Sequence, residues 1–314
     1  MILTVTLNAA LDLTHRVDRL RLHASNRVRQ VSARAGGKGV NVARVLHALG
    51  HESVVTGLAG GPTGEALRRD LAASGLPDQL VPIGGETRRT VAVYDEERAD
   101  TTILLEPGPV VTAAEWAAFL QRFEQLLPPA RAVVLSGSLP AGLPEDAYAQ
   151  LIRRARAHGV PALLDADGRA LLAGLEEAPA VVKPNAHELA AASGTDDPRA
   201  GAEALRAAGA QSVVASLGPD GLIACTLQGS WHARPPQAVT GNPTGAGDAA
   251  VAALALGLVA RTPWPERLTQ AVALSAAAVA APLAGDFDPV LHRRLRHQVS
   301  VQPLAPLEGE TRCP

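Results

Sequence analysis

Short apolar runs alternate with amphipathic stretches along most of the chain. An apolar strand is predicted at residues 2–7, and the apolar positions of residues 42–49 then recur at helical spacing. Later helices are predicted at 112–127, 144–158, 186–193, 199–208, 249–260 and 271–281, and strands at 132–135, 161–165, 181–183 and 212–216. Short apolar strands separated by helices are typical of a mainly parallel sheet covered on both faces. The pattern therefore predicts an α/β fold.

Two segments interrupt this alternation. Residues 9–34 form a long, basic and irregular excursion, and residues 84–106 contain two β-rich segments, 88–93 and 101–105, around a polar turn. We interpret both segments as parts of a small β-lid over a ligand-binding crevice, because closure of a lid excludes water from a reactive donor. Residues 301–314 lack such a pattern and are predicted to be a loose C-terminal tail.

Composition narrows the class of protein. An apolar content of 47% in 314 residues allows one large domain with a substantial core. The 29 Lys and Arg residues against 31 Asp and Glu residues leave a net charge of -2, which argues against nucleic-acid or membrane partners. The two cysteines lack the spacing of a metal site or a disulfide framework, and neither a signal-peptide pattern nor a bilayer-spanning segment is visible. We therefore expect a cytoplasmic protein.

A glycine-rich turn leads into the apolar segment 249–260. In Gly245-Ala246-Gly247-Asp248, small residues let the backbone approach a ligand, and the free amides of the following helix favour phosphate or developing negative charge. Asp248 is open to two interpretations. It is either a general base that takes a proton from a hydroxyl, or a helix cap, which the spacing alone favours slightly.

A second glycine-rich loop lies near the N-terminus. Gly36-Gly37-Lys38-Gly39-Val40-Asn41 precedes the helix predicted at 42–49. It is not a nucleoside-triphosphatase P-loop, because Lys38 is followed by Gly39 rather than Ser or Thr. It also fails as a dinucleotide fingerprint, because Val42 stands where the third glycine is needed.

Two further strand ends carry polar residues. Asn185 and Glu188 either form a capping box or bind Mg²⁺ through its water shell, and these residues alone do not decide between the two. The turn 216–221 is ordinary by itself. Because ligands bind at the carboxyl ends of strands in open α/β sheets, these loops, with those carrying Asp12 and Ser138, are expected to form one crevice.

Taken together, the motifs resemble the ribokinase-like (phosphofructokinase B) carbohydrate kinases over about residues 1–295, in the branch of 1-phosphofructokinase and tagatose-6-phosphate kinase. The resemblance depends on seven stretches in the family's order: Thr4 to Asn8 with Asp12, Gly36 to Val42, Gly85 to Arg88, Glu106 to Pro109, Ser136 to Pro140, Lys183 to Asn185 with Glu188, and Gly245 to Asp248. It implies a three-layer α/β/α sandwich with a β-lid formed by segments 9–34 and 84–106, ATP and Mg²⁺, and a homodimer clasped through the lids.

The resemblance also implies residue roles. Asp248 would be the base, and the anion hole would consist of the amides of Gly245, Ala246, Gly247 and Asp248. The sugar would be held by Asp12, Gly36, Gly37, Lys38 and Asn41, and its phosphate by Arg88, Ser138 and Arg27. The nucleotide side would contain Lys183, Asn185, Ser216, Gly218 and Gly221, together with Gly245 and Gly247. Asn185 and Glu188 would hold Mg²⁺ through water.

The expected function is ATP-dependent phosphorylation of a primary hydroxyl of a ketohexose phosphate, with fructose 1-phosphate as the first choice. Arg88 favours a phosphorylated sugar, because a planar guanidinium suits a dianionic group. Tagatose 6-phosphate and fructose 6-phosphate remain alternatives within the class, and a nucleoside or an unphosphorylated sugar is a third. A non-catalytic sugar-phosphate binding protein is the alternative from another class.

Overall fold

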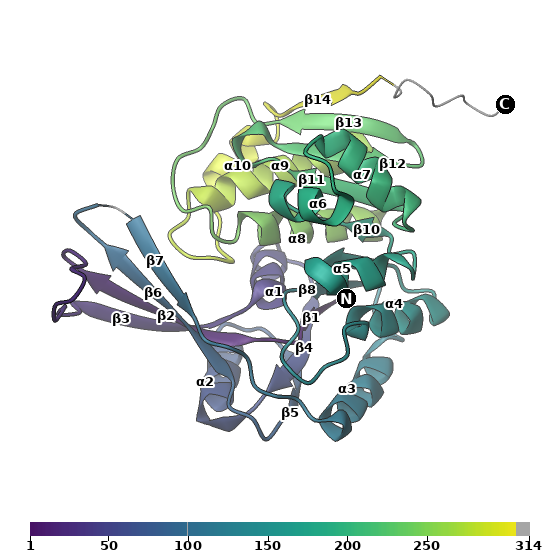
Figure 1. Cartoon of the computed structure of the whole chain (residues 1–314). Helices are drawn as coiled ribbons and strands as arrows, with labels where there is room; N and C mark the ends of the chain where they lie inside the picture. The colour runs from purple at the N-terminus through teal and green to yellow at the C-terminus, as the bar shows by residue number, and fades with distance from the viewer. Residues whose placement is uncertain (99, 306–314) are drawn as a thin grey trace.

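The computed structural model describes residues 1–98 and 100–305, and within them a large sheet forms the centre of the molecule (Figure 1). The ten strands of this sheet follow the order β14-β13-β12-β11-β10-β9-β8-β1-β4-β5. Their bounds are β1 Ile2–Thr6, β4 Ser53–Ala59, β5 Asp78–Pro82, β8 Ala132–Ser136, β9 Ala162–Asp165, β10 Val181–Val182, β11 Ser212–Ser216, β12 Leu222–Thr226, β13 Gly229–Arg234 and β14 Ser300–Pro303. Seven strands that are adjacent in this sheet pair in parallel: β11, β10, β9, β8, β1, β4 and β5. Strands β12, β13 and β14 extend the sheet beyond β11 with antiparallel pairs.

Helices cover both faces of the sheet. Their bounds are α1 Lys38–Ala48, α2 Gly61–Ala73, α3 Ala113–Leu126, α4 Ala147–Ala157, α5 Gly168–Leu175, α6 Ala186–Ser193, α7 Pro198–Ala207, α8 Ala246–Ala260, α9 Trp264–Val279 and α10 Pro289–Leu295. One buried cluster joins α3 to α7 with strand residues such as Val133, and another joins α1, α8 and α9 with Val134 on the other face. Successive strand side chains point to opposite faces, so strands buried on both sides are apolar throughout. The predicted α/β class with helices on both faces is confirmed.

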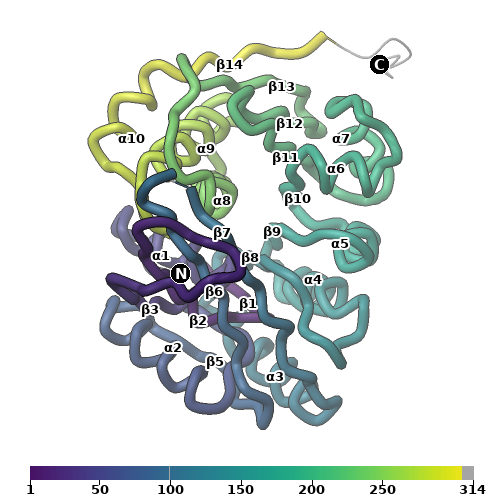
Figure 2. The backbone as a smooth tube through the Cα atoms, turned by 60° about the vertical axis from the view of Figure 1, so that its left-hand side comes forward, coloured from purple at the N-terminus to yellow at the C-terminus, as the bar shows by residue number. Residues whose placement is uncertain are grey.

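A separate four-stranded sheet projects from the main body (Figure 1). It contains β2 (Ala10–Val17), β3 (Gln30–Gly36), β6 (Arg88–Asp95) and β7 (Asp100–Leu105) in the order β3-β2-β6-β7. Figure 2 brings this sheet toward the viewer, with α2 packed beside its base. The excursion that looked irregular in the sequence thus contains β2 and β3. Its alternation was not visible because five residues of β3, 30–34, are exposed or only partly buried.

The C-terminal prediction is wrong in part. Residues 301–303 belong to β14, which pairs in antiparallel fashion with β13, rather than to a loose tail. Backbone hydrogen bonds to the neighbouring strand hold this short segment, although its side chains are mostly exposed and give no apolar pattern. Residues 306–314 of the predicted tail lie outside the described residues. Among the described residues, the structure contains no helix that is both long and apolar enough to cross a bilayer.

Candidate active site

The predicted site residues gather where the order of the parallel strands changes direction. The chain leaves β1 to form β4 on one side of it and β8 on the other, which is the switch point at which open α/β sheets bind ligands. The loops after β1 and β8 meet there, since Asn8 Nδ2 donates to Ser138 Oγ at 3.1 Å. Strands β9, β10 and β11 end at the same edge with Asp165, Lys183 and Ser216.

Helix α8 begins at this edge without a side-chain cap. Its N-cap residue, Gly245, has a φ of 87°, a left-handed conformation that favours glycine. A Cβ atom there would lie 2.9 Å from Ala284 Cα, so a larger residue has no room. The amides of the first turn have no intrahelical acceptors, and they carry the positive end of the helix dipole. This end of α8 can therefore hold an anion.

The carboxylate of Asp248 points to the other glycine-rich loop. Its Oδ2 accepts a hydrogen bond of 2.8 Å from Asn41 Nδ2, and only 6% of the residue is exposed. Burial, together with the charge of Asp165, raises the pKa of Asp248 to about 6, although Asn41, Lys38 and Lys183 oppose the shift. The interpretation of Asp248 as a helix cap is wrong, because its side chain makes no cap hydrogen bond. A buried carboxylate with a raised pKa has the properties of a general base.

The N-terminus of α1 brings Asp12 into the same region. Gly37 caps the helix with a φ of 108°, and a Cβ atom on Gly36 would overlap the Asp12 carboxylate. The loop therefore needs glycine to leave space for this side chain. Burial raises the pKa of Asp12, while a hydrogen bond from Thr90 and the charge of Arg88 act against that change.

A charged cluster lies between the two helix ends. Asp165 is 1% exposed, and its Oδ1 lies 3.4 Å from Lys38 Nζ and 3.4 Å from Lys183 Nζ. Burial disfavours the charged form of Lys38, but Asp165, Glu188 and Asp248 outweigh it and raise the pKa of this lysine. Lys38 therefore keeps a positive charge that suits a phosphate. Asp165 was not among the predicted site residues, although its position at a strand end beside Asp167 was a usable signal.

The predicted nucleotide side includes the capped N-terminus of α6. Asn185 and Glu188 form a complete capping box on α6, in which Asn185 Oδ1 accepts from Glu188 N and Glu188 Oε2 accepts from Asn185 N, both at 2.8 Å. The other oxygen of Glu188 lies 3.9 Å from Lys38 Nζ. The described residues contain no group of three or more His, Cys, Asp or Glu side chains that could hold a metal ion directly.

The remaining nucleotide-side residues lie on neighbouring segments. Ser216 forms an isolated β-bridge with Asn185, and Gly218 and Gly221 border a short 3₁₀ turn with φ values of 60° and 86°. A Cβ atom on Gly247 would lie 3.5 Å from Lys183 Nζ, so the α8 turn and the end of β10 are adjacent. These contacts connect the residues predicted for the nucleotide with the open end of α8.

Two of the three residues predicted to bind the sugar phosphate are connected through Asn8. Arg88 Nε donates to the carbonyl oxygen of Asn8 at 3.2 Å, and the Asn8 side chain donates to Ser138. Burial lowers the pKa of Arg88, and Asp12 and Glu106 oppose this change. Arg27 is exposed on the segment between β2 and β3, and no hydrogen bond or ion pair among the described residues connects its side chain with the site.

Comparisons with known proteins agree with this geometry. The family model for pfkB carbohydrate kinases matches residues 3–290. Phosphofructokinase-2 from Escherichia coli, crystallised with potassium, is 29% identical with a TM-score of 0.89, over 94% of this chain and 98% of that one. A possible 1-phosphofructokinase from Thermotoga maritima is 29% identical with a TM-score of 0.87, over 97% of this chain and 100% of the other.

A more distant structure shares the fold. Ribokinase from Arabidopsis thaliana, complexed with ribose and ATP, is 19% identical with a TM-score of 0.73, over 94% of this chain and 98% of that one. The α/β architecture described above is therefore ribokinase-like. The family match covers nearly the whole chain and includes both glycine-rich loops. The protein belongs to the pfkB family of carbohydrate kinases.

Proposed function

We propose that this carbohydrate kinase transfers the γ-phosphoryl group of ATP to a primary hydroxyl of a ketohexose phosphate, with fructose 1-phosphate as the first choice. One observation carries the proposal: the carboxylate of Asp248 contacts Asn41 of the sugar loop at the uncapped end of α8. A hydroxyl held by Asp12 and Asn41 would lie beside a base and beside free amides. Asp12 belongs to the strand that pairs with β6, which begins with Arg88.

The chemistry then follows from these positions. Asp248 takes the proton of the hydroxyl as its oxygen forms a bond to the γ-phosphorus, and the bond from that phosphorus to the β,γ-bridging oxygen breaks, which releases ADP. The amides of the α8 turn, with Lys38 and Lys183, stabilise the negative charge on the transferring group. Catalysis of this kind depends mainly on positioning and electrostatics.

Glu188 and Asn185 offer oxygen atoms suited to Mg²⁺ through bound water. The capping box uses only one carboxylate oxygen of Glu188, which leaves Oε1 beside Lys38. Bound Mg²⁺ would neutralise charge on the donor phosphates. The residues thus fit an outer-sphere site, in which water molecules lie between Mg²⁺ and these oxygen atoms.

Arg88 supports a phosphorylated acceptor over an unphosphorylated sugar. Its guanidinium is half buried, and only one of its donors, Nε, forms a hydrogen bond in the described structure. A guanidinium with donors to spare beside the sugar loop suits a phosphate. A protein that only binds the sugar phosphate would not need the buried base at Asp248.

A coupled assay for ADP release tests the proposal with fructose 1-phosphate, tagatose 6-phosphate, fructose 6-phosphate and unphosphorylated fructose. We expect the highest kcat/KM with fructose 1-phosphate, and an Arg88→Ala variant should raise the KM for the phosphosugar by roughly 10- to 100-fold, since hydrogen bonds to charged groups contribute about 1.5–3 kcal/mol. The KM for ATP should barely change. Equal losses for both substrates would contradict the assignment of Arg88, and a lack of ADP release with every sugar would contradict the function.

We also propose a homodimer formed through the lid. All six residues of β7 are exposed, including Ile103, Leu104 and Leu105, and such an apolar edge is suited to a partner. Light scattering should give twice the chain mass for the wild type and the chain mass for a Leu104→Glu variant. A monomeric wild type would contradict this assembly. The cytoplasmic location stays a prediction.

A further inference from the structure

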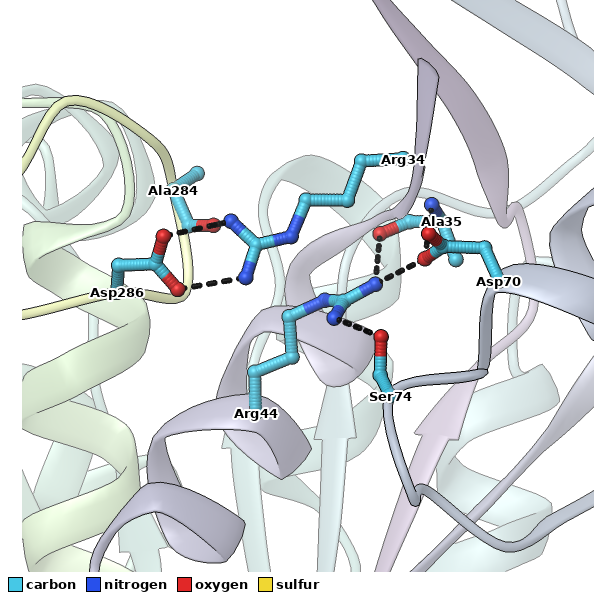
Figure 3. Close-up of polar contacts among 7 residues, drawn as sticks. All are labelled: Arg34, Ala35, Arg44, Asp70, Ser74, Ala284 and Asp286. Carbon is cyan, nitrogen blue, oxygen red and sulfur yellow. Dashed lines mark hydrogen bonds and ion pairs between the residues drawn. The ribbon is translucent and has the colours of Figure 1, made fainter. Parts of the chain in front are cut away.

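Arg34, on strand β3 of the projecting sheet that we interpret as the lid, forms hydrogen bonds to the loop that follows α9 (Figure 3). Its Nη1 donates to Asp286 Oδ2 at 2.9 Å and its Nη2 to Asp286 Oδ1 at 2.6 Å, and Nη1 also reaches the carbonyl oxygen of Ala284 at 3.3 Å. A bidentate pair of this geometry is stronger than an ordinary surface ion pair. The side chain of Arg34 is 24% exposed and that of Asp286 is 41% exposed, so solvent screens the contact mainly from the Asp286 side.

This loop, which contains residues 284–286, contacts the N-terminal ends of both α1 and α8. A Cβ atom on Gly245 would lie 2.9 Å from Ala284 Cα, and a Cβ atom on Gly285 would lie 3.2 Å from Asn41 Cα. The loop therefore packs against the backbone of both segments, and on the α1 side the Arg44 side chain also contacts it, since its Cδ would lie 3.1 Å from the Cβ atom on Gly285. A displacement of residues 284–286 would move the cap of α8 and the residue that holds Asp248.

A second guanidinium, that of Arg44, lies near Arg34. Arg44 is buried and is held by Asp70, by the carbonyl oxygen of Ala35 at 3.3 Å and by Ser74 Oγ at 2.9 Å (Figure 3). Burial and the nearby charge of Arg34 lower the pKa of Arg44, whereas Asp70 and Asp286 raise it. Without the carboxylate at position 286, Arg34 would face another cation.

The carboxylate of Asp12 is an alternative partner for Arg34. The two residues are paired across β2 and β3, and the charge of Arg34 acts on Asp12. If Arg34 left Asp286, it would be drawn toward Asp12, because the two strands hold them opposite each other. An ion pair there would occupy the carboxylate proposed to hold the sugar.

We propose that Arg34 and Asp286 form a positioning pair. The pair fixes the N-terminal end of α1 relative to the N-terminal end of α8. It also keeps Arg34 away from Asp12, so that the Asp12 carboxylate is free to bind the hydroxyls of the acceptor sugar. The second part rests on the proposed function, since it takes Asp12 to be a sugar ligand. Neither residue touches the reacting atoms.

The kinetic test compares Asp286→Asn with Glu124→Gln. The control removes an ion pair of similar length, Arg154 Nε to Glu124 Oε1 at 2.9 Å, between two helices that carry no candidate site residue. We expect Asp286→Asn to raise the KM for the best phosphosugar of the panel by about tenfold or more, because it leaves a partly buried charge unpaired. The KM for ATP should change less than about twofold, Asp286→Glu should restore most of the loss, and the control should behave like the wild type.

Hydrogen exchange of the free enzyme tests the positioning role without any substrate. Asp286→Asn should speed exchange in two segments distant in sequence, 36–41 and 245–248, and the control should speed neither. Faster exchange confined to 284–288, or unchanged exchange, would overturn the proposal. If Asp286→Asn does not fold, Arg34→Lys replaces it, since lysine keeps the charge but loses the bidentate geometry. A wild type inactive on every sugar would refute the proposed function, while the exchange result would still decide the role of the pair.

Discussion

Helices α6 and α8 both begin at the candidate site, but their first turns are built differently. In α6 the side chains of Asn185 and Glu188 satisfy the helix end reciprocally. In α8 the cap is Gly245, no side chain bonds to the first turn, and the carboxylate of Asp248 turns to Asn41 instead. Both ends carry an acidic residue at the third helical position, so its position alone does not distinguish a cap from a base.

The difference shows which helix end is available to a ligand. An amide already bonded to a side chain at α6 has little left for a phosphate. In α8 the amide of Ala246 donates to Pro243 O at 3.2 Å, but those of Gly247 and Asp248 remain open. The lack of a competent cap residue is therefore the informative feature of Gly245-Ala246-Gly247-Asp248. The capping interpretation of Asn185 and Glu188 is correct, and the Mg²⁺ role of these residues stays a proposal beside it.

The largest expected effect comes from removing the base. Asp248→Asn should lower kcat by at least ~100-fold with little change in sugar binding, because asparagine cannot take the proton but keeps an acceptor for Asn41. Steady-state kinetics and equilibrium binding of the phosphosugar measure the two quantities. The matched control is Asp197→Asn, since Asp197 does cap its helix by accepting from Arg199 N and Ala200 N. A near-normal rate for Asp248→Asn would remove Asp248 from the mechanism.

The pH dependence of kcat/KM gives an intermediate effect. Asp248 acts when deprotonated, and its pKa is raised to about 6, so activity should fall about tenfold per pH unit below pH 6 and level off above pH 7. Circular dichroism at each pH separates this loss from unfolding. A kcat/KM that stays constant down to pH 5 would show that the carboxylate of Asp248 has an ordinary pKa. The distinction between a base on α8 and a cap on α6 would then have no support from the pH dependence.

The smallest expected effect belongs to the capped helix. Glu188→Gln should raise the Mg²⁺ concentration needed for half-maximal rate by roughly threefold to tenfold, because a neutral amide binds a hydrated cation less well. The control is Glu115→Gln, which changes the equivalent residue of the capping box on α3, where Thr112 is the cap. If both variants shift the Mg²⁺ requirement equally, Glu188 has only its capping role.

Much of the fold was predictable because burial on both faces makes a strand apolar. The central strands and most helices were found within a few residues. Helix α2 begins at Gly61, four residues before the helix that the sequence predicts at 65–74, since its first turn carries glycine and proline. Helix α9 begins at Trp264, seven residues before the helix predicted at 271–281. In the projecting sheet, β6 and β7 were predicted at 88–93 and 101–105, within two residues of their bounds. Strands β2 and β3 were not predicted, because their side chains are mostly half-exposed or exposed and show no clear alternation.

The candidate site was predictable where a local motif carried the signal. The turn at Gly245 and the loop at Gly36 could be found because glycine is needed for the backbone there. The buried Asp165 and the contact between Arg34 and Asp286 join residues far apart in sequence, 252 positions in the latter case, and no local pattern predicts such a pair. The partner of Asp248 was likewise not visible until Asn41 was placed beside it.

The pairing of β14 with β13 has a practical consequence for protein production. Strand β13 lies between β12 and β14, and residues 300–303 are synthesised after every other strand of the described sheet. A polypeptide shortened to end at Val299 would expose the hydrogen-bonding groups of Trp231 to Arg234, a ready template for intermolecular strand addition. Fusion partners and purification tags should therefore be joined beyond this strand and not in place of it.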